Sequence, residues 1–404
     1  MTDRFRWHPD ARLHDSAGRE VRPLPSKGPV LPDSADGLAQ AIGLSAFRIG
    51  APERTPPDTG ERPVFETLTS GSTGQPRRIR RSQASWIASF SVNAGLGIGP
   101  GARVAVLGRL VHSLALYGAI EGLHLGAEVH LLDALRPDRQ RQALGLRRVT
   151  HLYATPAQLR LLVGPGSLSD LRLILVGGSK LDAALRAAIT ALAPQAQVRE
   201  FYGAAETSFI TLADTATPGA SVGRPYPGVE LSLDPSGEVW VKSPYLFERY
   251  ADDPRSPADA SQSGQGIPAA DQPIGSTRWR DGWLSVGEVG QFKDGFLFLK
   301  GRAGRMVTVA DQNVFPEEIE AFLATLPGIT RAAVLPRPDA RRGTVLIALA
   351  QGDPGREAAI LADLRQELGP LKAPKALIWL DDWPVLPSGK TDLRALEALA
   401  RWPA

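Results

Sequence analysis

The stretch Thr67-Leu-Thr-Ser-Gly-Ser-Thr-Gly-Gln-Pro-Arg77 is the most informative part of this chain. It directly follows the short apolar segment Val64–Phe65, and hydroxyl residues and two glycines fill its centre. Glycines let backbone N–H groups turn toward an anion, and hydroxyls add further donors at little steric cost. The stretch therefore predicts a loop that binds phosphate. It is not a Walker A loop, because the pattern GxxxxGK[ST] is absent.

The composition around this loop is that of a folded globular protein. The chain has 404 residues, of which 43% are hydrophobic and 22% are charged, and this length predicts two or three domains. It contains no cysteine, which excludes disulfides, thiolate nucleophiles and cysteine-based metal sites. Its six histidines include no HExxH pair, so the sequence offers little for a histidine metal cluster.

The charge pattern and the N-terminus exclude two further classes of protein. The chain has 46 basic and 43 acidic residues, and its dense arginine clusters are small, so we expect no nucleic-acid partner. The first residues, MTDRFRWHPDARLHD, lack the apolar core of a signal peptide. No apolar run reaches the length of about 18 residues that a membrane span requires. We therefore expect a soluble, cytoplasmic protein. The arginine clusters are Arg77, Arg78, Arg80 and Arg81, and Arg331, Arg337, Arg341 and Arg342.

Downstream of the loop, short apolar strands alternate with helical stretches. This alternation predicts α/β layers around a largely parallel sheet. Residues 1–60 are rich in proline, glycine and charge, and the only helix predicted there lies near residues 35–44. The predicted strands of the sheet are 104–108, 128–133, 151–156, 171–178 and 198–203, and the predicted helices are 114–125 and 181–192.

After Glu206 the pattern becomes β-rich, with antiparallel strands joined by glycine turns, and residues 251–276 are predicted to be a loop or insertion. The rest returns to a compact α/β pattern, with helices at 316–325 and 356–368 and strands near 332–335 and 344–350. The predicted fold class is therefore α/β. We expect a large N-terminal domain, 1–302, of layered sheets and helices with a β-rich subdomain at about 207–300, and a small mobile C-terminal α/β domain, 303–404.

Further short motifs follow the loop in a fixed order along the chain. They are Gly177-Gly-Ser179, Tyr202-Gly-Ala-Ala-Glu206, Trp283-Leu-Ser-Val-Gly-Glu288, Gly301-Arg302, Pro316-Glu-Glu-Ile-Glu320 and Pro387-Ser-Gly-Lys390. With the loop they resemble the adenylate-forming superfamily, which includes acyl-CoA synthetases, luciferases and carrier-protein adenylation domains. The resemblance covers roughly residues 62–395 and is greatest to small acyl- or aryl-CoA ligases.

The resemblance implies an ATP-dependent, AMP-forming ligase that converts a carboxylic acid into an acyl-adenylate and then transfers the acyl group to a thiol. It assigns adenine stacking to Tyr202, ribose binding to Glu288 and Arg302, and Mg²⁺ binding to Glu206, since Mg²⁺ prefers oxygen ligands. Lys390 would reach both the acid oxygen and the α-phosphate. The implied ATP-binding set is Thr69, Ser70, Gly71, Ser72, Thr73, Gly74, Arg77, Gly177, Gly178, Ser179, Tyr202, Gly203, Glu288 and Arg302.

The resemblance also places the acid pocket in the segment Arg109–Gly118. Its mostly apolar character favours an aryl or medium-chain acyl acid, and the absence of an aspartate disfavours an amino acid. The implied lining is His112, Leu116, Tyr117 and Ser179, with Gly203 opposite; His112 is also a catalytic candidate.

Several positions depart from the family pattern. Arg77 and Glu288 stand where lysine and aspartate are usual, and Arg305 occupies the hinge position, where we expect an exposed side chain. Asp311 replaces a glycine that lines the pantetheine path, and its charge would narrow that channel. The phosphate loop also begins earlier than in typical members, so we expect part of the N-terminal subdomain to be missing. A homodimer contact, another partner subunit or a more open pocket would compensate.

The acceptor therefore stays open at this level. CoA is the leading thiol, and the phosphopantetheine of an acyl carrier protein is the alternative, because acidic carrier proteins would complement arginine-rich patches. An amine is a third acceptor. A different class of function is a catalytically weak member that binds nucleotide and acts through protein contacts, which the altered Ala205, Glu288, Arg305 and Asp311 would favour.

Overall fold

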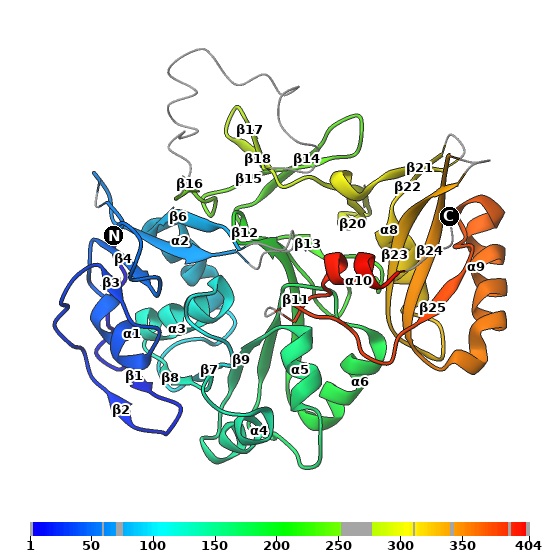
Figure 1. The fold of residues 1–404 in the computed structure, drawn as a ribbon. Helices are drawn as coiled ribbons and strands as arrows, with labels where there is room; N and C mark the ends of the chain where they lie inside the picture. The colour runs from blue at the N-terminus through cyan, green and yellow to red at the C-terminus, as the bar shows by residue number, and fades with distance from the viewer. Residues whose placement is uncertain are drawn as a thin grey trace. The chain divides into compact units, whose positions relative to one another are not determined.

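The computed structural model describes residues 3–58, 60–69, 76–251, 277–309, 312–339, 343–386 and 389–400 (Figure 1). These residues form two compact units. The first comprises the described parts of 3–230 and 241–251, and the second comprises those of 231–240 and 277–400. The predicted domain boundary between residues 302 and 303 falls inside the second unit, so that boundary and a rotation about it stay predictions.

The largest sheet of the first unit confirms the predicted parallel α/β core. Strands β11, β10, β9, β7, β8 and β1 are mutually parallel, and strands β12 and β13 at one end of the sheet and β2 at the other run antiparallel to their neighbours. The strand order is β13 (Arg224–Pro225), β12 (Ser208–Leu212), β11 (Gln197–Ala204), β10 (Leu173–Val176), β9 (His151–Ala154), β7 (Arg103–Val106), β8 (Glu128–Leu131), β1 (Arg12–His14) and β2 (Glu20–Val21).

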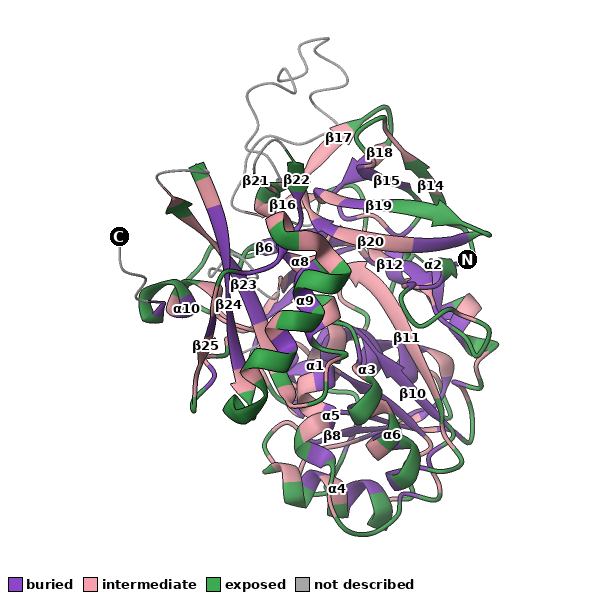
Figure 2. Ribbon diagram, turned by 90° about the vertical axis from the view of Figure 1, so that its right-hand side faces the viewer, coloured by how far each residue is buried: buried purple, intermediate pink, exposed green. Residues whose placement is uncertain are grey.

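Helices cover both faces of this sheet, as a buried parallel sheet requires. On one face, α4 (Pro137–Leu146), α5 (Pro156–Leu162) and α6 (Ala183–Leu192) share an apolar core with Ala105 and other strand residues. On the other face lies α3 (Ser113–Leu125), which approaches closely through Gly118, because a Cβ there would lie 2.6 Å from the Tyr153 ring. The purple strands of Figure 2 show this burial.

A second sheet of the same unit joins the start of the chain to the predicted phosphate loop. Its order is β16 (Arg249–Tyr250), β6 (Arg78–Ser82), β5 (Val64–Leu68), β4 (Ala46–Ile49) and β3 (Val30–Leu31). The predicted N-terminal helix is confirmed as α1 (Ala35–Ala41). Strands β1–β4 were not predicted. They are two to four residues long, which is too short for a clear alternating pattern, and β1 pairs with the distant β8.

The second unit contains much of the predicted β-rich region and the C-terminal α/β pattern, whereas β12, β13 and β16 belong to the first unit and the division between the units crosses β14 and β15. The β-rich strands are β14 (Glu230–Leu233), β15 (Val239–Lys242), β17 (Arg278–Arg280), β18 (Trp283–Ser285), β19 (Glu288–Lys293) and β20 (Phe296–Arg302). Next come β21 (Val307–Val309), β22 (Gln312–Val314), α8 (Pro316–Leu323), β23 (Ile329–Asp339), β24 (Gly343–Gly352), α9 (Glu357–Lys372), β25 (Leu377–Trp379) and α10 (Leu393–Leu399). Residues 252–276 of the predicted insertion lie outside the described residues.

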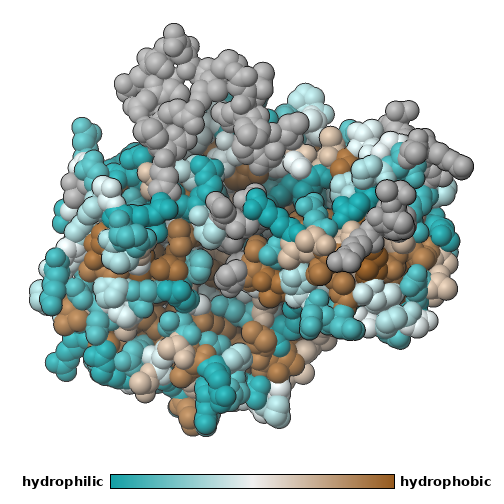
Figure 3. Space-filling model, in the orientation of Figure 1, coloured by the Kyte–Doolittle hydropathy of each residue, from teal (hydrophilic) through white to brown (hydrophobic). Residues whose placement is uncertain are grey.

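The surface mixes hydrophilic and hydrophobic residues, which interleave on the face shown in Figure 3. Large apolar side chains at the surface include Leu146 and Leu161, which are 76% and 63% exposed. Among the described residues, no helix combines the length and the apolar character needed to cross a bilayer.

Candidate active site

The predicted phosphate loop joins the two strands of the β5–β6 hairpin. The backbone N–H of Thr69 donates to the carbonyl of Arg77 at 2.8 Å, and the N–H of Arg77 donates to the Thr69 hydroxyl at 2.9 Å. These two bonds hold the ends of the loop together. Its centre, with the predicted Ser70, Gly71, Ser72, Thr73 and Gly74, lies outside the described residues.

The segment predicted to carry the acid pocket lies beside the base of this loop. The N–H of Leu68 donates to the carbonyl of Val111 at 3.0 Å, and Leu68 forms an isolated parallel bridge with His112. His112 is the N-cap residue of α3. Burial lowers the pKa of His112 below its ordinary 6.5, Arg109 lowers it further and Asp33 opposes the shift. His112 is therefore a neutral imidazole at pH 7, held next to the phosphate loop.

Two further motifs meet at the carboxyl edge of the parallel sheet, where ligands of such sheets commonly bind. Gly177 follows β10, and its backbone packs on Phe201 so closely that a Cβ would lie 2.1 Å from the ring. Gly178 has a φ of +97°, which favours glycine. Ser179 is exposed, whereas Tyr202 is half-buried on the neighbouring strand β11.

The turn after β11 places the predicted magnesium ligand Glu206 beside a residue that sequence reasoning missed. The hydroxyl of Tyr250 donates to Glu206 Oε1 at 2.8 Å. The guanidinium carbon of Arg77 lies 3.1 Å from the centroid of the same ring, which is a cation–π contact. Tyr250 therefore links Arg77 at the end of the phosphate loop to Glu206. It lies one residue before the end of the described segment, at the edge of the predicted insertion, and no sequence motif marks it.

Arg81 supports the same turn from below. It is fully buried, and its guanidinium donates to the carbonyl of Ala205 at 2.5 Å and to that of Tyr245. Burial lowers the pKa of Arg81 to about 9, and Glu206 opposes the shift, so the side chain is still cationic at pH 7. Arg81 is a positioning residue that the sequence showed only as part of an arginine cluster.

The burial of this arginine cluster corrects one expectation. Arg78, Arg80 and Arg81 are 5%, 8% and 0% exposed, and Arg80 pairs with Glu248 at 3.1 Å. Arg78, Arg80 and Arg81 are therefore internal structure of the first unit and cannot contribute to the expected docking patch for an acidic carrier protein, whereas Arg77 is exposed and the patch around Arg331 and Arg337 stays a prediction.

Leu116 and Tyr117 are 0% and 4% exposed. The hydroxyl of Tyr117 donates to Glu121 at 3.0 Å within a fully buried polar network. Their side chains are thus packed inside the first unit, and an acid-pocket role for them stays a prediction.

The second unit brings together the two residues predicted to bind ribose. Glu288 and Arg302 are opposite one another in the β19–β20 pair, and Arg302 Nε donates to Glu288 Oε1 at 3.0 Å. Lys390 is half-buried and follows the glycine of a tight turn. Asp311 lies outside the described residues.

The predicted hinge residue Arg305 differs from expectation. We expected an exposed side chain, but it is 22% exposed and is held by Glu320 at 2.7 Å and Glu317 at 3.1 Å. Burial lowers the pKa of Arg305, but the two carboxylates outweigh it and raise that pKa above its ordinary value. The hinge role stays a prediction, and it would require the chain to bend around a tethered side chain.

Gly203 offers a stability prediction at this site. A Cβ there would lie 1.9 Å from the backbone oxygen of Ser208, so Gly203→Ala forces the β11–β12 pair apart. We expect a loss of roughly 1–3 kcal/mol in the free energy of unfolding, measured by urea denaturation. Gly219→Ala is the control, since nothing lies within 4 Å of its added Cβ. Equal stability of the two variants would contradict the close approach.

Comparison with known proteins agrees with this geometry. The AMP-binding enzyme family matches residues 9–251, and the AMP-binding enzyme C-terminal domain matches residues 318–390. The chain is 30% identical to the uncharacterized acyl-CoA ligase YhfT of Bacillus subtilis, over 82% of this chain and 67% of that protein. It is 29% identical to the fatty acid–[acyl-carrier-protein] ligase ScoC of Streptomyces coeruleorubidus, over 95% of this chain and 76% of that protein.

A solved structure extends the comparison. The amide bond synthetase McbA from Marinactinospora thermotolerans superposes with a TM-score of 0.70 at 25% identity, covering 92% of this chain and 79% of McbA. The loop anchors, the strand-end motifs and Glu206 therefore lie in a fold shared with adenylate-forming enzymes. The chain belongs to the AMP-binding enzyme family of adenylate-forming ligases.

Proposed function

We propose that this ligase uses ATP to activate an aryl or acyl carboxylic acid in the cytoplasm and passes the acyl group to a thiol, with CoA as the leading acceptor. The observation that carries the proposal is the convergence of Thr69, Arg77, His112 and Glu206 around one hairpin and one strand end of the first unit. Positioning and charge neutralisation are what phosphoryl chemistry requires of a protein.

In the first step, a carboxylate oxygen of the acid attacks the α-phosphorus of ATP. A new P–O bond forms, and the bond to pyrophosphate breaks with the electron pair leaving on pyrophosphate. The anchored ends of the loop, Thr69 and Arg77, would hold the departing phosphates. The neutral His112 would orient the acid by a hydrogen bond without attracting a second anion.

The residues present fit a magnesium ion beside these phosphates. Glu206 offers carboxylate oxygens, the ligand type that Mg²⁺ prefers, and the Tyr250 hydroxyl fixes one of them. Bound there, Mg²⁺ would neutralise phosphate charge. Arg81 holds the turn that presents Glu206 through the neighbouring carbonyl of Ala205.

In the second step, the thiol sulfur attacks the acyl carbon, AMP leaves with the electron pair of the acyl–oxygen bond, and the thiol proton passes to solvent. The likeness to YhfT supports CoA, and the likeness to ScoC supports a carrier-protein phosphopantetheine. McbA is an amide bond synthetase, so its likeness supports an amine as the remaining alternative.

The test of the proposal is pyrophosphate release with ATP and Mg²⁺ across aryl, short, medium and long acyl acids. CoA, a phosphopantetheinylated carrier protein and a simple amine are offered in parallel, and product formation identifies the acceptor. ATP binding without acid-dependent release would instead favour the catalytically weak alternative. A homodimer would be detected in the same preparation by light scattering.

The magnesium role of Glu206 makes a separate prediction. Glu206→Gln should lower the rate of pyrophosphate release at least about 10-fold at the wild-type magnesium optimum. Substituting even the residues that hydrogen-bond to metal ligands lowers metal affinity or activity about 10–100-fold. Raising the Mg²⁺ concentration should restore part of the rate. Tyr250→Phe, which removes only the hydroxyl that donates to Glu206, should have a smaller effect. Glu230→Gln, an exposed carboxylate on β14, is the control, and an identical magnesium profile in all variants would refute the role.

A further inference from the structure

A polar cluster outside the proposed active site lies at the β8–β1 end of the large sheet. Across the sheet, one row of paired residues runs from Leu152 through Ala105 to His130 and His14. Leu152 and Ala105 belong to the apolar core, but the row ends in two imidazoles. Glu128 is two residues before His130 on β8, and side chains two apart on a strand share a face.

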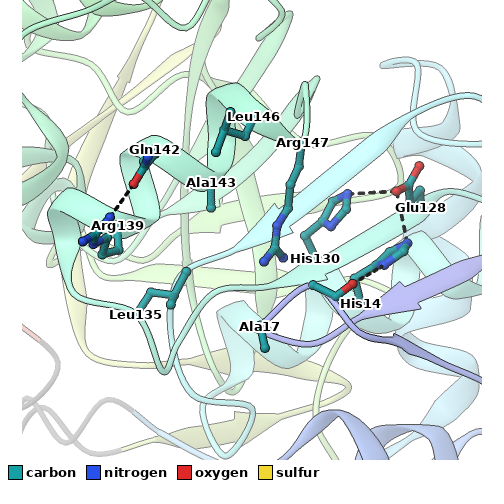
Figure 4. Close-up of a pocket in the computed structure, with 11 residues that line it drawn as sticks. His14, Ala17, Glu128, His130, Leu135, Arg139, Gln142, Ala143, Leu146 and Arg147 are labelled. Atoms are coloured by element: carbon teal, nitrogen blue, oxygen red, sulfur yellow. Dashed lines mark hydrogen bonds and ion pairs between the residues drawn. The ribbon is translucent and has the colours of Figure 1, made fainter.

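The three side chains point at one another in Figure 4. Nε2 of His14 lies 3.1 Å from Glu128 Oε1, and Nε2 of His130 lies 3.3 Å from the same oxygen. The two rings stack with centroids 4.9 Å apart. One potential ligand atom from each of the three residues lies within 4.8 Å of the others. In a tetrahedral zinc site, bonds of 2.0–2.2 Å place neighbouring ligand atoms about 3.4 Å apart.

Hydrogen bonding does not account for this arrangement. Among the described residues, the contacts with Glu128 Oε1 lack hydrogen-bond geometry, so Nε2 of His14 and both ring nitrogens of His130 are buried without a hydrogen bond, and His130 is only 2% exposed. Leaving buried ring nitrogens unsatisfied is costly.

The neighbouring cations leave Glu128 Oε1 to the two imidazoles. Arg103 Nε lies 3.3 Å from Glu128 Oε2, which leaves Oε1 to face the imidazoles. The guanidinium of Arg147 donates to the carbonyls of Asp15 and Ser16 at 3.0 and 2.7 Å. The cluster opens into a cavity of about 710 Å³, which is also lined by residues of α4. A metal ion would reach the cluster through this cavity. The side of the ion that faces the cavity would take a water molecule as a further ligand.

We propose that His14, Glu128 and His130 form a binding site for a first-row divalent transition metal ion, of which Zn²⁺ is the probe. Two imidazoles and one carboxylate are a ligand set that Zn²⁺ uses in proteins with water in the fourth position. The ion joins the N-terminal strand β1 to its neighbour β8. The site is separate from the proposed ligase chemistry, and none of its residues belongs to the ATP-binding set.

The experiment uses the full chain without a histidine tag, stripped with a chelator and dialysed. Zn²⁺ is titrated calorimetrically in the absence of ATP, and Co²⁺ is added separately to record its visible spectrum. We expect one equivalent of Zn²⁺, an intense tetrahedral Co²⁺ band and slower proteolysis of the N-terminal segment when metal is bound. His14→Gln and Glu128→Gln should each weaken Zn²⁺ binding by more than about 10-fold, since even outer partners of metal ligands have effects of this size.

His8→Gln is the matched control, because His8 also lies near a carboxylate, Asp10 at 3.7 Å, but within the described part of the chain no third ligand group joins this pair. It should bind Zn²⁺ as the wild type does. The absence of stoichiometric binding by the wild type would overturn the proposal, as would equal affinity in all variants. If a substituted chain does not fold, the wild-type Co²⁺ spectrum decides, because a weak octahedral band would also overturn it.

Discussion

Replacing Lys390 with alanine should lower acid-dependent pyrophosphate release by about 10²–10³, which corresponds to about 2.7–4 kcal/mol of transition-state stabilisation. The turn that carries Lys390 is closed by the N–H of Leu386, which donates to the Lys390 carbonyl at 2.8 Å, and by a bridge between Val385 and Thr391. Gly389 allows this turn with a φ of +79°. The side chain is thus presented from a fixed backbone, as a cation acting on developing charge must be.

The measurement compares initial rates of pyrophosphate release with ATP binding measured separately. Lys375→Ala is the control: it removes a lysine of the same unit whose Nζ donates to the Pro370 carbonyl at 3.1 Å, and it should retain the wild-type rate. ATP affinity should change little in Lys390→Ala, because the lost interaction forms mainly in the transition state. Equal rates in wild type and Lys390→Ala would show that this lysine has no role in adenylation.

Titration of Glu121 should make the stability of the first unit fall as pH rises from about 4.5 to about 7. Glu121 is fully buried on α3 and accepts hydrogen bonds from Asn93 at 2.9 Å, Tyr117 at 3.0 Å and Tyr153. Burial raises the pKa of Glu121 from 4.5 to about 7, and the three donors oppose it. Between these two values the folded state holds more protons than the unfolded chain, so the free energy of unfolding decreases with pH, by roughly 3 kcal/mol in all.

Glu121→Gln tests this prediction, because the amide does not titrate. Urea unfolding followed by tryptophan fluorescence at pH 4.5–8 should show that the variant lacks this part of the fall. The free energy of unfolding of the variant, relative to that of the wild type, should therefore rise by roughly 3 kcal/mol across this pH range. Glu53→Gln, which changes an exposed carboxylate, should follow the wild-type curve. Parallel curves for Glu121→Gln and the wild type would contradict the raised pKa.

Glu121→Ala should destabilise the protein by about 3 kcal/mol or more at pH 4.5, and this deficit should shrink toward pH 7 because alanine does not titrate. The substitution removes the acceptor of two tyrosine hydroxyls and one amide, and each buried donor left unsatisfied costs about 1–3 kcal/mol. The same unfolding measurement checks this result. A loss below 1 kcal/mol would mean that the donors find other partners.

Much of the fold could be predicted from local pattern. Apolar strands alternating with helices indicated the parallel sheet, and the strands Arg103–Val106, Glu128–Leu131 and His151–Ala154 lie within two residues of their predicted bounds. The strands of the first 50 residues were missed, because each is short and its partner is remote. The parallel pairing of β1 with β8 leaves no trace in either segment alone.

The candidate site divides in the same way. The motif order was sufficient to identify the family and to select Thr69, Arg77 and Glu206. The contacts that hold them were not predictable: Arg81 reaches Ala205 across 124 residues of sequence, and Tyr250 reaches Glu206 across 44. The expected exposure of Arg305 was wrong, because two carboxylates of α8 pair with it.

By itself, the sequence determined the α/β class and the family, because these depend on the period of apolar residues and on the order of local motifs. Only the tertiary structure decided that Arg78, Arg80 and Arg81 are internal, that Glu121 is enclosed by hydroxyl and amide donors and that His14 meets Glu128 and His130. Burial sets the protonation state of a side chain, and pairing across strands determines which other side chains it contacts. These depend on neighbours that are distant in sequence and close only in the folded chain.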